Sequence, residues 1–258
     1  MTSTWAAGRL DVAMPAGGRV RPDRVRGMGT EYKPLARLGN EYLSQRAIRN
    51  LRQWPRVNRI ALAAPPPVLR EIGVLADRAV EDHGSGPANL QACLEALDLP
   101  PWVLLAGCDT PFISADVGEQ FLERCPAEAD LCFSYVAAER YEAEFPGSPY
   151  LALPLRGGRI VFGSLHLART SVLQGRRDLF ERAFSARKKP WRMARLIGLS
   201  AAVKFAARRL TLGDVEARVG RLLGCACVGV ESPDAAIAFD VDKPDHLLDA
   251  HRFLANYP

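Results

Sequence analysis

Carboxylates stand directly after two apolar stretches that are far apart in the chain. Asp109 follows Trp102–Ala106, a short apolar run that is typical of a strand buried on both faces of a mostly parallel sheet. Asp240 and Asp242 follow a later apolar stretch. Ligands of open α/β sheets bind outside the carboxyl ends of the strands, so these acids can meet at one sheet edge and hold Mg²⁺. Taken alone, each acid could equally cap a turn.

Two glycine-rich loops follow predicted strands and could hold the phosphates of a nucleotide. The first begins Ala16-Gly17-Gly18 and leads to Lys33. Glycine lacks a Cβ, so its backbone N–H groups can approach phosphate closely, and a lysine after the loop adds a point charge. The second loop is Gly84-Ser-Gly-Pro87. Neither the P-loop nor the GxGxxG pattern is present, so a flexible loop without a ligand is the competing interpretation.

Helical and strand patterns alternate through the first half of the chain and would place these loops at one edge. Tyr42–Trp54 has apolar residues at helical spacing, with arginines on the opposite face. Ser114 is a suitable N-cap for a helix over Ala115–Arg124. The other strands and helices expected in this half are Leu10–Ala16, Arg59–Ala64, Arg78–Glu81, Ala88–Leu97 and Asp130–Ala137. This alternation predicts an α/β fold with a Rossmann-like, mostly parallel sheet flanked by helices.

The second half of the chain departs from this alternation. Tyr150–Leu155 and Arg159–Leu167 predict an antiparallel hairpin, which we expect to be an addition that covers the acceptor side of a site. Further elements are expected over Leu212–Leu223 (helix), Cys225–Val230 (strand), Ile237–Phe239 (strand) and Asp245–Ala255 (helix). No internal repeat or linker is evident, so we expect one domain over residues 1–258, with a helical insertion at 169–224.

Basic residues gather in two regions, although the net charge is only +5. The segment from Arg19 to Arg26 is rich in arginine, and residues 169–209 are expected to be helical and basic. Both regions predict anionic ligands. A basic amphipathic helix can lie on an anionic membrane surface, and it can equally be the outer helix of a globular domain. No pattern of aromatic residues accompanies the basic ones, so a nucleic-acid partner is not expected.

Cysteines and apolar segments narrow the class of protein further. The six cysteines form no CxxC pair, and Cys225-Ala-Cys227 is too close for ordinary zinc-ligand spacing, so buried, reduced thiols are expected. No run of about eighteen apolar residues predicts a transmembrane helix. The start of the chain lacks the order of a signal peptide, because Asp11 interrupts its apolar stretch. These features predict a cytoplasmic protein.

Four motifs, taken in order, resemble those of the MobA-like NTP transferases, nucleotidyltransferases of the GT-A-like superfamily. They are Pro15-Ala-Gly-Gly18 with Arg26-Gly-Met-Gly29 and Lys33-Pro-Leu35, Gly84-Ser-Gly-Pro87, Gly107-Cys-Asp-Thr-Pro-Phe112 and Asp240-Val-Asp-Lys-Pro-Asp-His-Leu247. The resemblance extends from Leu10 to Leu254, and residues 169–224 are much less typical. The first loop is longer than in the family and Gly27 displaces its signature arginine, so Arg24 or Arg26 could take that role.

The resemblance implies a GT-A-like fold and a Mg²⁺-dependent transfer of a nucleoside monophosphate. The donor would be an NTP, the acceptor a small phosphorylated or otherwise anionic molecule, and the by-product pyrophosphate. Asp109 and Asp242 would hold Mg²⁺, and Asp240 would support their loop. Lys33 and Arg26 would act as catalytic residues that neutralise the leaving pyrophosphate. The implied nucleotide contacts are Ala16, Gly17, Gly18, Gly29, Lys33, Gly84, Gly86 and Pro87.

Two other functions fit the sequence. A GT-A glycosyltransferase is one, since Asp240-Val-Asp242 is formally a DxD motif, but its late position and the early loop with Lys33 favour triphosphate binding. A non-catalytic protein that binds nucleotides or a membrane surface through its basic helices is the other. The sequence leaves open the particular NTP, the acceptor, the role of the basic helices, the oligomeric state and which of Asp240 and Asp242 binds the metal.

Overall fold

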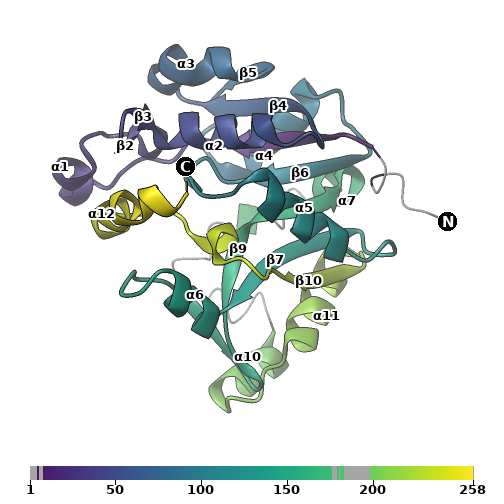
Figure 1. The fold of residues 1–258 in the computed structure, drawn as a ribbon. Coiled ribbons are helices and arrows are strands. Elements are labelled where there is room, and N and C mark those ends of the chain that lie inside the picture. The colour runs from purple at the N-terminus through teal and green to yellow at the C-terminus, as the bar shows by residue number, and fades with distance from the viewer. Residues whose placement is uncertain (1–4, 6–7, 176–178, 180, 183–197, 258) are drawn as a thin grey trace.

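Figure 1 shows a computed structural model of the chain, in which helices cover both faces of a central sheet. The structure describes all residues except 1–4, 6–7, 176–178, 180, 183–197 and 258. The sheet has the strand order β10-β7-β9-β6-β1-β4-β5, with β8 paired to β9. The strand bounds are β1 Leu10–Pro15, β4 Val57–Ala64, β5 Arg78–Glu81, β6 Trp102–Ala106, β7 Leu131–Ala137, β8 Ala152–Leu155, β9 Gly158–Arg169 and β10 Cys227–Glu231. A separate antiparallel pair is formed by β2, Arg37–Leu38, and β3, Glu41–Tyr42.

Parallel pairing characterises the half of the sheet around β1. This strand pairs in parallel with β4 and β6, and β4 pairs in parallel with β5. The residues of β1 and β6 are almost all buried, as the unbroken apolar run of β6 predicts. Asp11 within β1 is also buried, and its carboxylate forms an ion pair with Arg59. Because parallel strands end at the same edge, the loops that follow β1, β5 and β6 all begin at one edge of the sheet. The predicted α/β fold with a mostly parallel sheet is confirmed.

The predicted hairpin exists, but β9 is an inner strand of the sheet rather than an addition to it. It runs antiparallel between β6 and β7 and pairs with both, whereas β8 pairs with β9 alone. Leu165 and Leu167 of β9 enter the core on one face of the sheet, and Ala168 enters the core on the other. Strand order is set by pairing between distant segments, which alternation along one segment does not reveal.

The helices on the two faces come from different parts of the chain. Buried residues of α2, α5 and α12 belong to the core on one face, and those of α4, α7 and α11 belong to the core on the other. The α-helix bounds are α1 Val25–Met28, α2 Leu43–Gln53, α3 Pro66–Ile72, α4 Gly86–Ala96, α5 Ala115–Arg124, α6 Ala138–Glu144, α7 Thr170–Gln174, α10 Leu199–Ala206, α11 Leu212–Leu223 and α12 Pro244–Phe253. Short 3₁₀ helices are η1 Pro22–Arg24, η2 Lys33–Leu35, η3 Gly73–Leu75, η4 Ala235–Ala238 and η5 Leu254–Asn256.

Local sequence signals correctly predict the limits of α5, but the strand that they predict at Ile237–Phe239 is absent. The side chain of Ser114 accepts the N–H of Val117, which is the cap that the sequence predicts. Ile237–Phe239 is not a strand: the segment forms η4, and the Asp234 carboxylate caps it by accepting the N–H of Ala236. A short apolar run does not distinguish a strand from a buried turn of helix. Residues 176–178, 180 and 183–197 of the basic region at 169–209 lie outside the described residues, which include α7 and α10.

Close packing between α5 and Trp54 leads to a prediction of stability. A Cβ on Gly118 would lie 2.6–2.8 Å from three carbon atoms of the Trp54 ring, which is buried. Alanine is favoured over glycine in a helix by about 1 kcal/mol, but overpacking a core costs about 1–3 kcal/mol. We therefore expect Gly118→Ala to lower the urea midpoint with an unchanged m value.

A second glycine-to-alanine exchange provides the control for Gly118→Ala. Gly213 lies in α11, where an added Cβ would have its nearest neighbours 4.0 Å away. Gly213→Ala should keep or raise the urea midpoint, because the helix gains propensity without a clash. Equal midpoints for the two variants would show that the Trp54 ring does not restrict Gly118.

Candidate functional site

A cavity of about 690 Å³ opens where β1, β5 and β6 end. Its wall combines the two glycine-rich loops, the turn after β6 and Asp242 from the segment before α12. Of the predicted nucleotide contacts, those in the wall are Gly17, Gly18, Lys33, Gly84 and Gly86. These five residues, which the sequence predicted as nucleotide contacts, come from separate parts of the chain and line one cavity.

Three predicted nucleotide contacts are not part of this wall. Ala16 is buried, and its N–H donates to the carbonyl of Ala63. Gly29 ends α1 in the left-handed conformation, with φ at 68°, so it shapes the loop through its backbone. Pro87 stands in the first turn of α4, where a proline is well tolerated. Each of them supports a loop whose neighbours reach the cavity.

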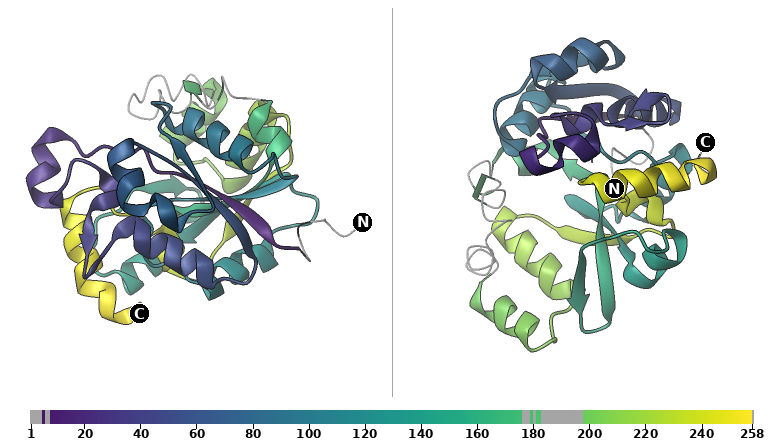
Figure 2. Two further views of the ribbon diagram at one scale, coloured as in Figure 1. Left: turned by 90° about the horizontal axis from the view of Figure 1, so that it is seen from above. Right: turned by 90° about the vertical axis from the view of Figure 1, so that its left-hand side faces the viewer.

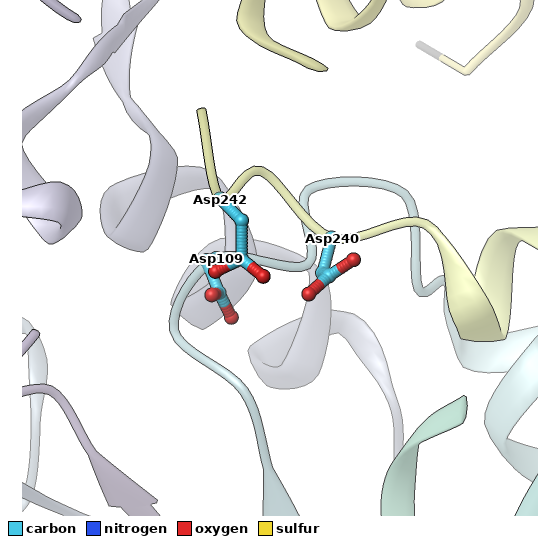
Figure 3. A group of neighbouring side chains, drawn as sticks. All are labelled: Asp109, Asp240 and Asp242. Atoms are coloured by element: carbon cyan, nitrogen blue, oxygen red, sulfur yellow. The ribbon is translucent and has the colours of Figure 1, made fainter. Parts of the chain in front are cut away.

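The three acids lie close together, as Figure 3 shows, and two of them, Asp109 and Asp242, line this cavity. Carboxylate oxygens of Asp109, Asp240 and Asp242 all lie within 4.8 Å of one another. The N–H of Val241 donates to the carbonyl of Asp109 over 3.0 Å, which joins the two acid-bearing segments directly. An all-carboxylate set of this size is the kind of donor set that hard divalent cations prefer.

A buried aromatic contact also holds the two acid-bearing segments together. The rings of Phe112 and Phe239 lie 5.0 Å apart, and Phe145 packs against both at 6.1 and 4.6 Å. Phe112 stands three residues after Asp109, and Phe239 immediately precedes Asp240. These rings are fully buried, so the positions of the acids are fixed by core packing.

Lys33 lies between two of the acids. Its Nζ forms an ion pair with Asp109 Oδ2 and another, of 2.5 Å, with Asp242 Oδ1. Its N–H donates to the carbonyl of Gly18 over 2.9 Å, so the lysine is anchored to the first loop. Burial acts to lower the pKa of Lys33, but the two carboxylates outweigh it and hold that pKa above the ordinary value. The ammonium therefore stays charged.

The pKa values of Asp240 and Asp242 are shifted in opposite directions. Burial, together with the charges of Asp109 and Asp242, raises the pKa of Asp240 to about 8. Burial also opposes ionisation of Asp242, but the Lys33 ammonium outweighs it and holds the pKa of that carboxyl below its usual range. Without a metal, Asp240 thus retains a proton at neutral pH.

This protonation gives a pH dependence that can be measured. The pKa of Asp240 is about 8 in the folded chain and about 3.9 in an unfolded one. Between pH ~4 and pH ~8 the folded chain therefore keeps a proton on Asp240 that the unfolded chain has released. Stability from this group is present below pH ~4 and is lost as the pH rises to ~8. We therefore measure the melting temperatures of Asp240→Asn and of the parent protein in EDTA. The melting temperature of the variant minus that of the parent should increase steadily from pH 5 to pH 8.

The control for Asp240→Asn is Glu123→Gln, an exposed carboxyl on α5. Its melting-temperature difference from the parent should stay constant with pH. A constant difference for Asp240→Asn as well would show that the Asp240 carboxyl titrates normally in the folded protein.

Asp82 and Asn89 are cavity residues that the sequence analysis missed. Asn89 Nδ2 donates to Asp82 Oδ1 over 2.6 Å, and Asn89 Oδ1 accepts the N–H of His83 over 2.7 Å. A Cβ on Gly17 would lie 2.6 Å from both side chains, so this polar pair touches the first loop directly. A signal was present: Asp82 directly follows a predicted strand, much as Asp109 follows another.

Arginines of the first loop contribute positive charge, although not at every predicted position. Arg24 lies in the cavity wall together with Arg19 and Arg21. Arg26 is exposed and is not part of that wall. The geometry therefore favours Arg24 over Arg26 as the arginine nearest to a bound ligand. Figure 2 shows α12 beside α1, and a Cβ on the intervening Gly27 would lie 2.6 Å from Pro244.

Cys108 lines the cavity, yet its thiol is not a reactive group. Burial raises the pKa of Cys108 well above its ordinary value, and the neighbouring Asp109 acts in the same direction. All six cysteines are free thiols in the structure, and all but Cys225 are buried. Thr110 is also structural, since its hydroxyl donates to the carbonyl of Gly107 over 2.8 Å.

The model of the MobA-like NTP transferase domain matches residues 16–195, and the chain belongs to this family. This confirms the resemblance that the motifs indicated. The chain is accordingly a transferase enzyme of the nucleotidyltransferase class. Comparison with curated proteins gave no match.

Solved structures of similar fold include transferases. A hypothetical transferase from Thermus thermophilus has a TM-score of 0.80 and 27% identity, over 93% of this chain and 99% of that one. A 2-C-methyl-D-erythritol 4-phosphate cytidylyltransferase from the same organism has a TM-score of 0.56 and 19% identity, over 96% and 99%. A CMP:2-keto-3-deoxy-manno-octonic acid synthetase complexed with CTP has a TM-score of 0.58 and 16% identity, over 97% and 99%. The last two establish a shared fold alone.

Proposed function

We propose that the chain transfers a nucleoside monophosphate from an NTP to a small anionic acceptor, with Mg²⁺ at the acid cluster. The observation that carries the proposal is the placement of Lys33 and the acids at one edge of a cavity walled by both glycine-rich loops. Nucleotidyl transfer needs alignment and charge neutralisation more than it needs a nucleophilic side chain. This site supplies both and offers no activated thiol.

Residues of the first loop would hold the triphosphate. The backbone of Gly17 and Gly18 lies in the wall, where side chains would obstruct the approach of phosphates. Lys33 and Arg24 would neutralise the charge that develops on the leaving pyrophosphate. Arg26, which the resemblance implied, would need to move to take part. Gly84 and Gly86 would leave room for the base.

The acid cluster fits a divalent cation. Asp109 and Asp242 would hold it, and its chemistry when bound is to neutralise phosphate charge and orient the two reacting oxygens. Asp240 lies in the same cluster but retains a proton at neutral pH, which agrees with a role in supporting the loop. The oxygen-only donor set favours Mg²⁺ over Zn²⁺.

A thermal-shift panel of four NTPs with Mg²⁺ tests this proposal. The NTP that binds should raise the melting temperature in a concentration-dependent way, because a ligand that binds only the folded state stabilises it. The same NTP should then release pyrophosphate with an anionic acceptor. No shift with any NTP would overturn the proposal. Release of a nucleoside diphosphate from a nucleotide sugar would instead indicate a glycosyltransferase.

We also infer a membrane contact for the basic insertion. Residues 169–209 contain twelve Lys and Arg residues and only two acidic ones. In α10 the apolar side chains of Val203 and Phe205 are 58% and 43% exposed, beside the cations Lys204 and Arg208. This mixture suits an anionic lipid surface, whereas nucleic acid would be expected to require more stacking side chains. Among the described residues, no helix is both long and apolar enough to cross a membrane.

Liposome sedimentation checks this contact. Vesicles with phosphatidylserine should bind the protein, vesicles of phosphatidylcholine alone should not, and salt should weaken binding. Phe205→Ser should reduce binding several-fold. Val74→Ser, which alters a more exposed apolar residue away from the insertion, is the control. Equal binding to both vesicle types would contradict the inference.

A further inference from the structure

The ammonium of Lys33 lies where a cation held by the acids would have to lie. Its Nζ contacts Asp109 Oδ2 and Asp242 Oδ1, which are the two residues proposed as metal ligands. The lysine side chain is 20% exposed, so it lies inside the site and not across its mouth. A Cβ on Gly18 would be 3.3 Å from Lys33 Cε, so the first loop packs along the lysine stem.

One place cannot hold both cations. Mg²⁺ needs its oxygen ligands at about 2.0–2.1 Å, and an ammonium in contact with the same two oxygens excludes it. A divalent cation that arrives alone must therefore expel Lys33 from both carboxylates. The displaced ammonium would then be close to a second cation, in a partly buried site, without an anion to pair with. That cost opposes the binding of a metal ion by itself.

We propose that Lys33 is an internal counter-ion of the acid cluster, which a divalent cation replaces far more readily when a polyphosphate is present to receive the displaced ammonium. This inference rests on the proposed function and adds an order to it: metal and nucleotide bind together. Because coupling is reciprocal, each ligand raises the affinity of the other. In the absence of nucleotide, Lys33 keeps Asp109 and Asp242 from repelling each other.

Manganese titration of the nucleotide-free protein tests the proposal. The probe is Mn²⁺, which accepts the same oxygen ligands and loses its free-ion EPR signal when bound. Lys33→Met removes the ammonium but keeps the length of the side chain. We expect this variant to bind Mn²⁺ at least tenfold more tightly than the parent. Adding Asp109→Asn to Lys33→Met should abolish the gain, because it removes a ligand.

The matched control is Lys243→Met. Lys243 directly follows Asp242 in the chain but forms no ion pair with any described residue. It therefore measures the general effect of removing one positive charge near the acids, which should be less than threefold. A gain for Lys243→Met equal to that for Lys33→Met would overturn the counter-ion role.

A second measurement uses the unaltered protein, in case Lys33→Met does not fold. Reductive methylation, followed by mass spectrometry, reports how accessible each lysine amine is. Mn²⁺ at concentrations that EPR shows to be bound should speed methylation of Lys33 and leave that of exposed Lys204 unchanged. Unchanged methylation of Lys33 would overturn the counter-ion role. Failure of Mn²⁺ to bind either protein, with or without an NTP, would instead overturn the proposed metal site.

Discussion

Asp109→Asn is expected to lower turnover by on the order of a thousandfold, because it removes a carboxylate from the point where phosphate charge is neutralised. Asn keeps the size of the side chain and can still accept a hydrogen bond. Lys33 keeps its second ion pair with Asp242. The melting temperature of the variant should therefore change little. The measurement is pyrophosphate release at saturating Mg²⁺ and NTP, with the nucleotide identified in the thermal-shift panel.

Glu123→Gln is the control for this variant, since Glu123 is an exposed acid on the helix that follows Asp109. It should keep full turnover. If Asp109→Asn also keeps full turnover while Asp240→Asn loses it, the roles proposed for these two acids are reversed. If both retain full turnover, neither Asp109 nor Asp240 has a part in the reaction.

Phe239→Ala is expected to destabilise the fold by about 3–5 kcal/mol, the range for deleting a large buried aromatic side chain. Phe239 is fully buried and its ring contacts Phe112 and Phe145 at 5.0 and 4.6 Å. Denaturant unfolding measures the loss. Phe205→Ala, which alters a 43% exposed ring, should change stability by no more than about 0.5 kcal/mol.

A milder change at the same position separates stability from positioning. Phe239→Leu should leave the protein folded but loosen the contact that sets Asp240 and Asp242 against Asp109. We expect it to weaken Mn²⁺ binding in the presence of NTP, measured at a temperature well below the melting point. Unaltered Mn²⁺ binding in a folded Phe239→Leu would show that the Val241 to Asp109 hydrogen bond alone positions the acids.

Local patterns in the sequence were sufficient for the elements that carry the site. The strand Trp102–Ala106 and the helix Ala115–Arg124 have the predicted limits, since an apolar run, a proline and a serine cap act over short distances. The position of β9 inside the sheet could not be predicted, because pairing with β6 and β7 depends on remote segments. The prediction of a strand at Ile237–Phe239 was wrong, because so short an apolar run has no periodicity that distinguishes a strand from a helical turn.

The same distinction applies to the site. Strand-end positions were enough to predict that Asp109 and the final acids share one edge, and Figure 3 shows them together. The directions in which the side chains of the site point could not be predicted from the sequence. Nothing local indicates that Lys33 reaches the acids, or that Arg24 faces the cavity where Arg26 does not. The pairing of Asp82 with Asn89 likewise needs the loop and the helix to be in place.

The hydrogen bond between Val241 and Asp109 has a consequence for the order of folding. It closes a long loop of chain, and loop closure is entropically costly, so this contact is expected to form late, after the sheet. The same contact can open first. Brief detachment of the segment before α12 would dissolve the acid cluster while β1, β4 and β6 remain paired. In hydrogen exchange, the Val241 amide should therefore exchange faster than the amides of β1, and a bound metal and nucleotide should slow it.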